Sequence, residues 1–284
     1  MHEGKPSQTA LRVATHRAAH QLLDRPKVLD DPVALDMLGP ERAQALRADP
    51  RSSETSVIAR YMRAFVAARS RLAEDELGRA MERGVGQYVV LGAGLDTFAL
   101  RNPHPPEALK IFEVDFPATQ AWKWELMAQA GLAAPDSLTY VPLDFHRQTL
   151  AQGLERAGHD ATRPSFFSWL GVAPYLVPEA VRATLGFIAS CPKGSGVVFD
   201  YMIDPKGMSL WERLLLKGIG AVTKASGEPL RSHFEPAALA GELDALGFSQ
   251  TRDLDQAAIN GLYFSGREDG LGVGRMSHIM VGWV

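Results

Sequence analysis

From Gly84 onward the chain alternates short strand-forming runs with helical stretches, and this alternation constrains the fold more than any other feature of the sequence. The runs are rich in β-branched and aromatic residues and cover residues 87–91, 110–114, 138–142, 165–170 and 197–201. Helices are predicted between them, over residues 117–130, 149–156 and 178–190. Such a repeat joins parallel strands by right-handed crossovers, which predicts an α/β fold built on a doubly wound, mostly parallel sheet.

The two ends of the chain depart from this rhythm. The pattern is helical from residue 9, and residues 1–83 are expected to form an N-terminal helical cover on a core of residues 84–284, in one domain spanning 1–284. Residues 248–254 and 277–284 are expected to close one edge of the sheet as an antiparallel pair.

A further helical pattern at 209–221 interrupts the core after the fifth strand. Its apolar stripe includes Leu210, Leu214 and Ile219. Within an insertion at 205–235, this helix is expected to cover the substrate pocket as a lid. Core packing or a dimer contact explains the same stripe equally well.

Composition narrows the kind of partner. A net charge of −3, with no block of like charges, predicts neither a nucleic-acid arm nor a membrane patch, so a small molecule or a protein is expected. Cys191 is the only cysteine, which excludes an internal disulfide and CxxC sites, and no metal site is predicted. The first residues lack the apolar stretch of a signal peptide, so a cytoplasmic protein is expected.

A glycine-rich loop, Gly92-Ala93-Gly94, directly follows the first strand and precedes a predicted helix. Two glycines allow a sharp turn and let a ligand lie against the backbone N–H groups. Asp115 ends the second strand, twenty-one residues after Gly94, where an acidic side chain accepts both hydroxyls of a ribose. The loop and Asp115 together predict a nucleoside cofactor.

Residues after the loop indicate which nucleoside. A dinucleotide fingerprint has a third glycine where this chain has Thr97, and the turn carries Asp96, which repels a pyrophosphate. Asp96 suits a zwitterionic or cationic ligand such as the amino-acid end of S-adenosylmethionine. Asp144, with Phe145 packing on the ring, is expected at the adenine. The alternative is that Asp115 and Asp144 serve only as helix N-caps.

Several of these motifs together resemble the leucine carboxyl methyltransferase family, and in particular its bacterial branch. The matching stretches are LGAGLDT at 91–97, FEVD at 112–115, LD at 143–144, GVAPYL at 171–176, TALRVA at 9–14 and GEPLRS at 227–232. The resemblance covers nearly the whole chain. It implies a class I methyltransferase fold that binds S-adenosylmethionine, with the cofactor contacted by Gly92, Gly94, Asp115, Asp144 and Phe145.

The resemblance also implies that Arg69 binds the methionine carboxylate, for which the planar guanidinium fork is suited. Arg17 is a second candidate, and a solvated helix face is the alternative for Arg69. Two positions depart from the family pattern. Phe98 stands where many relatives have arginine, and Trp169-Leu170 stands where relatives have a glutamate that would contact the cofactor.

Methyl transfer from a sulfonium is an in-line displacement, so positioning of the acceptor supplies much of the catalysis. A carboxylate acceptor needs no base, whereas a phenol or alcohol does. The candidates for orienting or deprotonating an acceptor are His233, Tyr175 and Tyr201, with His146 beside Asp144. A solvated loop position is the favoured explanation of each histidine, and simple packing is the alternative for the two tyrosines.

The sequence thus predicts an O-methyltransferase that uses S-adenosylmethionine and acts on a carboxylate or hydroxyl of a small molecule. A protein carboxylate is a less favoured acceptor. The first alternative is a non-catalytic cofactor-binding or scaffold protein of the same fold. The second is a nicotinamide-dependent oxidoreductase, against which Thr97 argues.

Overall fold

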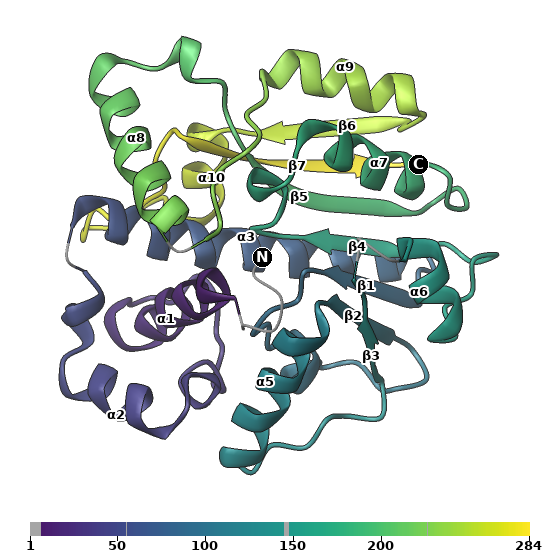
Figure 1. Ribbon diagram of the computed structural model, residues 1–284, viewed down its shortest axis with the longest axis horizontal. Coiled ribbons are helices and arrows are strands. Elements are labelled where there is room, and N and C mark those ends of the chain that lie inside the picture. The colour runs from purple at the N-terminus through teal and green to yellow at the C-terminus, as the bar shows by residue number, and fades with distance from the viewer. Residues whose placement is uncertain (1–6, 55, 145–147, 226) are drawn as a thin grey trace.

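The computed structural model describes residues 7–54, 56–144, 148–225 and 227–284, and these residues build their fold around one twisted sheet (Figure 1). In the described residues the strand order is β3-β2-β1-β4-β5-β7-β6. The strands are β1 (Gln87–Leu91), β2 (Lys110–Asp115), β3 (Leu138–Pro142), β4 (Phe166–Trp169), β5 (Gly196–Met202), β6 (Gln250–Leu254) and β7 (Ser277–Trp283). Strands β1 to β5 pair in parallel, and β7 runs antiparallel to both β5 and β6. The predicted doubly wound sheet with an antiparallel edge is confirmed.

Helices precede the sheet and cover both of its faces (Figure 1). The helices before and within the first half of the sheet are α1 (Gln8–Leu23), α2 (Pro40–Ala48), α3 (Val57–Glu82), α4 (Phe98–Arg101), α5 (Pro117–Gln129) and α6 (Leu150–Arg156). The later helices are α7 (Pro178–Ala189), α8 (Leu210–Ala225), α9 (Pro236–Leu246) and α10 (Gln256–Tyr263). Helix α10 was not predicted from the sequence pattern.

The strand alternation of β1 divides the core into two layers. Tyr88 and Val90 point to the face covered by α3 and α10, whereas Val89 and Leu91 point to the face covered by α6, α7 and α9. All four side chains are at most 6% exposed. A central parallel strand is buried on both faces, which is why this segment reads as an unbroken apolar run.

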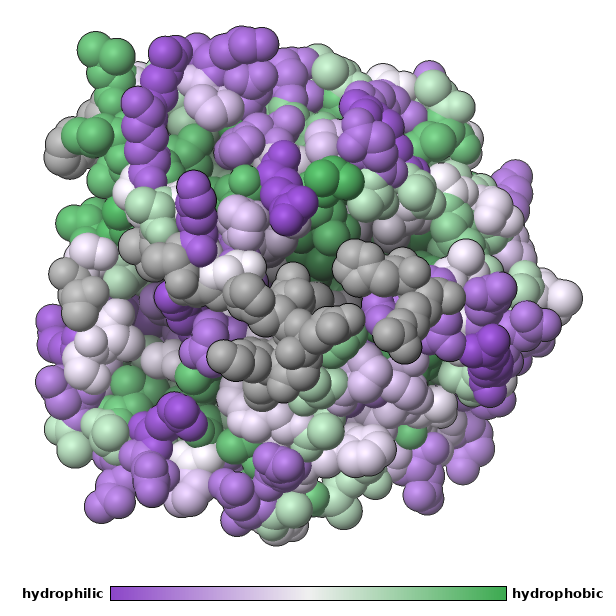
Figure 2. Space-filling model, viewed as in Figure 1, coloured by the Kyte–Doolittle hydropathy of each residue, from purple (hydrophilic) through white to green (hydrophobic). Residues whose placement is uncertain are grey.

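Helix α8 packs less completely than the others. Leu216 is buried against Met202 and Met208, but Leu210 is 85% exposed and Leu214 is 59% exposed. Figure 2 shows apolar side chains gathered at the upper left of the molecule, where Figure 1 places α8. None of the helices in the described part of the chain combines the length and apolar character needed to cross a bilayer.

Candidate functional site

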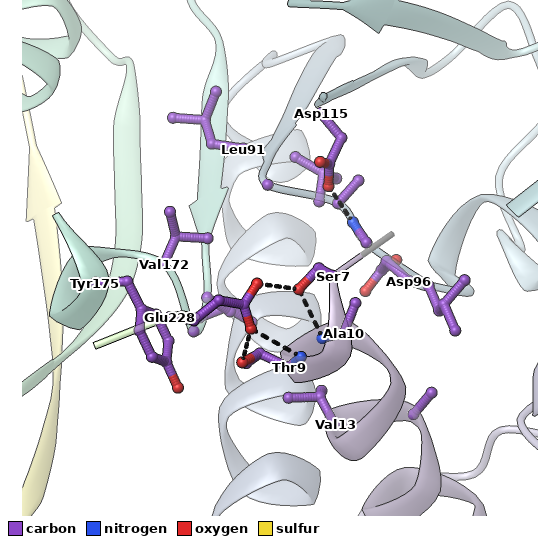
Figure 3. A pocket seen from close by; sticks show the side chains of 18 of the residues that line it. Ser7, Thr9, Ala10, Val13, Leu91, Asp96, Asp115, Val172, Tyr175 and Glu228 are labelled. Carbon is purple, nitrogen blue, oxygen red and sulfur yellow. Dashed lines mark hydrogen bonds between the residues drawn. The ribbon is translucent and has the colours of Figure 1, made fainter. Parts of the chain in front are cut away.

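A cavity of about 210 Å³ opens where the carboxyl ends of β1 and β4 lie side by side. The crossovers leave the sheet in opposite directions from these neighbouring strands, so their ends part and form a crevice. One part of its wall comes from the β1 and β4 ends, and the facing part comes from α1 and from residues 227–231 (Figure 3). The site therefore assembles segments from the whole length of the chain.

The glycine loop follows β1 directly and forms the floor of this cavity. Gly92 has φ +68° and Gly94 has φ +52°, a left-handed conformation that residues with a Cβ rarely adopt. A Cβ on Gly92 would lie 2.4 Å from Cγ2 of Val172. The helix expected after the loop is only one turn long, Phe98–Arg101, so the loop backbone itself, and not a helix terminus, faces the cavity.

Asp115 stands at the end of β2 and lines the cavity beside the loop (Figure 3). Its Oδ2 accepts from the backbone N–H of Gly94 at 2.6 Å, and its Oδ1 accepts from that of Phe116 at 2.6 Å. Burial raises the pKa of Asp115, against the lowering effect of these two hydrogen bonds. Each carboxylate oxygen keeps a second lone pair, so the group retains acceptors for a vicinal diol.

Asp115 and Asp144 do not cap the helices that follow them. Phe116 occupies the N-cap position of α5, and the side chain of Thr149 caps α6. The alternative that both aspartates serve only as N-caps is therefore wrong.

The turn after the loop is held by hydrogen bonds to buried charged side chains. Asp96 lines the cavity, and its Oδ1 accepts from the backbone N–H of Phe98 at 2.8 Å. The Thr97 hydroxyl donates to Asp31 at 2.6 Å, and Arg17 pairs with the same carboxylate at 3.0 Å. Arg17 also donates to the carbonyl of Leu95. This network makes the turn rigid and uses the charge of Arg17 internally.

Arg69 reaches the cavity from α3, but it is already paired. Its Nη1 donates to Asp200 Oδ2 at 2.9 Å, and Asp200 Oδ1 accepts from the Gly171 backbone N–H at 2.5 Å. Both charged side chains are 5% exposed. Gly171 has φ +73°, and a Cβ there would lie 2.6 Å from Arg69 Nη2. A ligand carboxylate would thus find only the part of the guanidinium fork that Asp200 leaves uncovered.

The facing wall joins the start of α1 to the loop after α8. Glu228 accepts hydrogen bonds from Ser7 and Thr9, and Tyr175 lies beside them (Figure 3). Burial raises the pKa of Tyr175, against a hydrogen bond with Thr9. None of the described residues of α8 lines the cavity, so the part of the expected insertion that reaches it is the loop 227–231.

The charged side chains that line the cavity, taken with the two aspartates directly behind its wall, carry a net negative charge. The carboxylates on the lining are Asp96, Asp115 and Glu228. Three arginines also line the cavity, but Arg17 and Arg69 are each neutralised by an aspartate directly behind the wall. Among the described residues, no carboxylate lies within ion-pairing distance of the third, Arg231. The arrangement suits a ligand that carries positive charge.

The structure brings six of the eight predicted cofactor residues together on the lining: Arg69, Gly92, Ala93, Gly94, Asp96 and Asp115. Asp144 is half-buried and is not among the described lining residues, and Phe145 lies outside the described residues, as does His146.

The three candidates for orienting or deprotonating an acceptor differ in their position relative to the cavity. Tyr175 lines the cavity. Tyr201 does not, because it is buried within the sheet and donates to Asp253 at 2.8 Å. His233 is also off the lining, its Nε2 is buried without a hydrogen-bond partner in the described residues, and burial lowers its pKa.

Sequence reasoning missed two acidic residues of the site. Asp200 interrupts the apolar run of β5, and a charged residue in a buried strand is a signal that could have been used. Glu228 belongs to the stretch GEPLRS that resembles the family, but no local pattern indicated its role, because its partners are 219 and 221 residues away. Leu170, at the position where the family pattern has a glutamate, does line the cavity.

The chain is similar in sequence to a known protein family. A model of the family described as leucine carboxyl methyltransferase matches residues 10–189. The Bacillus subtilis (strain 168) protein named "Putative S-adenosyl-L-methionine-dependent methyltransferase YktD" is 33% identical over 295 residues, covering 95% of each chain.

Two solved structures are similar over nearly the full length of the chain. A DUF574 family protein from Streptomyces avermitilis MA-4680 has a TM-score of 0.57 at 15% identity, covering 99% of this chain and 98% of that one. A protein described as a "putative methyltransferase" from Thermobifida fusca YX has a TM-score of 0.55 at 15% identity, with 99% and 96% covered. At this identity the likeness establishes the fold.

Proposed function

The chain belongs to the leucine carboxyl methyltransferase family, and on that premise we propose that it transfers a methyl group from S-adenosylmethionine to a carboxylate oxygen of a small molecule. The methyltransferase assignment replaces the scaffold and nicotinamide alternatives. The observation that carries the proposal is the cavity that joins the glycine loop, Asp115 and an excess of carboxylates at the switch point of the sheet.

The residues present fit S-adenosylmethionine, which supplies, when bound, an electrophilic methyl group on a sulfonium. Asp115 retains free lone pairs for the ribose hydroxyls. Gly92 and Gly94 leave the loop backbone bare, and a side chain at either would meet a neighbour within 3.1 Å. Asp96 supplies negative charge for the amino-acid end, and the uncovered part of Arg69 is available to its carboxylate.

The site has few groups that could remove a proton from an acceptor. Among the described lining residues there is no histidine, lysine or cysteine to deprotonate an alcohol. Each of the three lining carboxylates already accepts a hydrogen bond from a neighbouring group, and burial raises the pKa of Asp115. An acceptor that is already ionised at neutral pH needs no base. Arg231, exposed on the loop 227–231, offers positive charge to such an anion.

The cofactor part of the proposal is tested by calorimetric titration with S-adenosylhomocysteine. Asp115→Asn keeps the size of the side chain but removes its charge, and we expect a loss of affinity of about ten-fold to a hundred-fold, the range for hydrogen bonds to a charged group. Asp136→Asn is the control, because Asp136 is exposed and off the cavity. Equal affinity in both variants would remove Asp115 from the site.

The acceptor part is tested with matched pairs of carboxylic acids and alcohols and a labelled methyl donor. A methyl ester releases methanol in mild base, whereas a methyl ether does not, so the product class is read directly. Label in base-stable products alone would refute a carboxylate acceptor while leaving the cofactor assignment intact.

A further inference from the structure

One side of the cavity is closed by a contact between segments that are more than two hundred residues apart (Figure 3). Glu228 Oε1 accepts from the Ser7 hydroxyl at 2.7 Å. Glu228 Oε2 accepts from the Thr9 backbone N–H at 3.0 Å and also from the Thr9 hydroxyl. The carboxylate therefore caps the first turn of α1 from outside the helix, where a negative charge also interacts favourably with the helix dipole.

Apart from Glu228, the first turn of α1 is held by the Ser7 hydroxyl, which accepts from the Ala10 N–H at 3.1 Å, and by a hydrogen bond between Thr9 and Tyr175, with little complete burial. The described side chains of residues 8–11 are only partly buried or exposed, and full burial begins at Ala14. From there the helix is fixed, because Arg17 donates to the Leu95 carbonyl and pairs with Asp31. Helix ends with few buried contacts open locally at small free-energy cost, and opening of this turn would leave the contacts of Arg17 intact.

This first turn lies directly against the glycine loop. A Cβ on Gly94 would sit 3.1 Å from the Cβ of Ala10, so the helix touches the loop at the point where a ligand would lie against its backbone. Ser7, Thr9 and Ala10 all line the cavity. A ligand that enters along the loop must therefore displace or pass this turn.

We propose that Glu228 is a positioning residue that holds the first turn of α1 over the bound cofactor, and that S-adenosylmethionine and its product enter and leave when this contact opens. The inference rests on the proposed function. Binding of the cofactor closes the turn again, which excludes water from the site during transfer. In this proposal Glu228 acts through Ser7 and Thr9, the residues with which it forms hydrogen bonds.

The first test measures association and dissociation rate constants of S-adenosylhomocysteine by surface plasmon resonance. Glu228→Gln removes the charge and places an amide against the Ser7 or Thr9 donors, so we expect dissociation to accelerate about ten-fold, the loss of one hydrogen bond to a charged group. Association should accelerate as well, because the opened turn is more populated. Affinity then changes less than either rate.

Glu235→Gln is the matched control. Glu235 also caps a helix from a preceding loop, accepting from Ala237 and Ala238 at 3.2 and 2.7 Å at the start of α9, but it does not line the cavity. Its rates should equal those of the wild type. Equal rates in the wild type and Glu228→Gln, or equal acceleration in both variants, would refute the proposed role of Glu228. No binding by the wild type would instead refute the proposed function.

The second test needs no variant. Hydrogen exchange of the native chain, followed by mass spectrometry, should show faster exchange at residues 9–12 than at residues 14–21, and S-adenosylhomocysteine should slow the former selectively. Thr9→Val, which keeps the backbone N–H but loses the hydroxyl, should lie between wild type and Glu228→Gln in both tests. Uniformly slow exchange along α1, with or without ligand, would refute the opening of the first turn.

Discussion

Substituting Gly92 by alanine should destabilise the fold through two separate free-energy terms that glycine avoids. The first cost is the left-handed backbone, which is about 1–2 kcal/mol for a residue with a Cβ. A smaller unfolded-state entropy offsets about 0.4–1 kcal/mol of it. The second cost is steric, because the new Cβ would lie 2.4 Å from Val172 Cγ2, and overpacking of this kind costs about 1–3 kcal/mol.

Gly131→Ala supplies the matched control. Gly131 has φ +68°, the same as Gly92, and a Cβ there meets nothing within 4 Å. Gly131→Ala should therefore lose at most about 1–2 kcal/mol of unfolding free energy, and Gly92→Ala about 1–3 kcal/mol more. Only Gly92→Ala should also lower the affinity for S-adenosylhomocysteine, because Gly92 lines the cavity whereas Gly131 is exposed at the end of α5.

Urea unfolding and calorimetric titration measure the two effects separately. Val172→Ala in the Gly92→Ala background removes the clashing methyl and leaves the Val172 Cβ position 3.6 Å away, an ordinary contact. The double variant should regain most of the steric term. Equal destabilisation by Gly92→Ala and Gly131→Ala, or no recovery in the double variant, would refute the steric reasoning.

Three further predictions follow from buried groups. Burial and nearby arginines lower the pKa of His16 to about 4, so on acidification His16 is protonated first in the unfolded chain. Up to about 3 kcal/mol of stability is therefore lost as the pH falls from 6.5 to 4. His16→Gln should flatten this pH dependence of the unfolding free energy, measured by urea unfolding at several pH values. Asp200→Asn leaves the charge of Arg69 uncompensated and should cost about 3 kcal/mol in urea unfolding, whereas Glu242→Gln, which breaks an exposed pair, should cost less than about 1 kcal/mol. Tyr201→Phe should lose about 1 kcal/mol of stability and leave turnover in the labelled-methyl assay unchanged, since its hydroxyl bonds within the sheet; a fall in turnover without loss of stability would place it in the site.

Local signals in the sequence were sufficient to predict the strands, the glycine loop and Asp115. Apolar runs separated by helical patterns located the parallel strands because side-chain alternation and burial follow directly from residue order. The glycines of the loop and Asp115 were recognised for the same reason, since their spacing is set by one strand, one turn and the next strand. The helix predicted after the loop proved to be a single turn, because Asn102 precedes Pro103 and takes an extended ψ of 120°, as residues before a proline tend to do.

The rest of the site depends on contacts between distant segments, which residue order does not encode locally. Arg69 was expected to bind a ligand carboxylate, but Asp200 on β5, 131 residues away in the chain, pairs with it. The closing contact of Glu228 with Ser7 and Thr9 exists only because the crossovers bring the loop after α8 back over the start of α1. Charge pairing in a buried site depends on three-dimensional distance, and chain folding sets that distance.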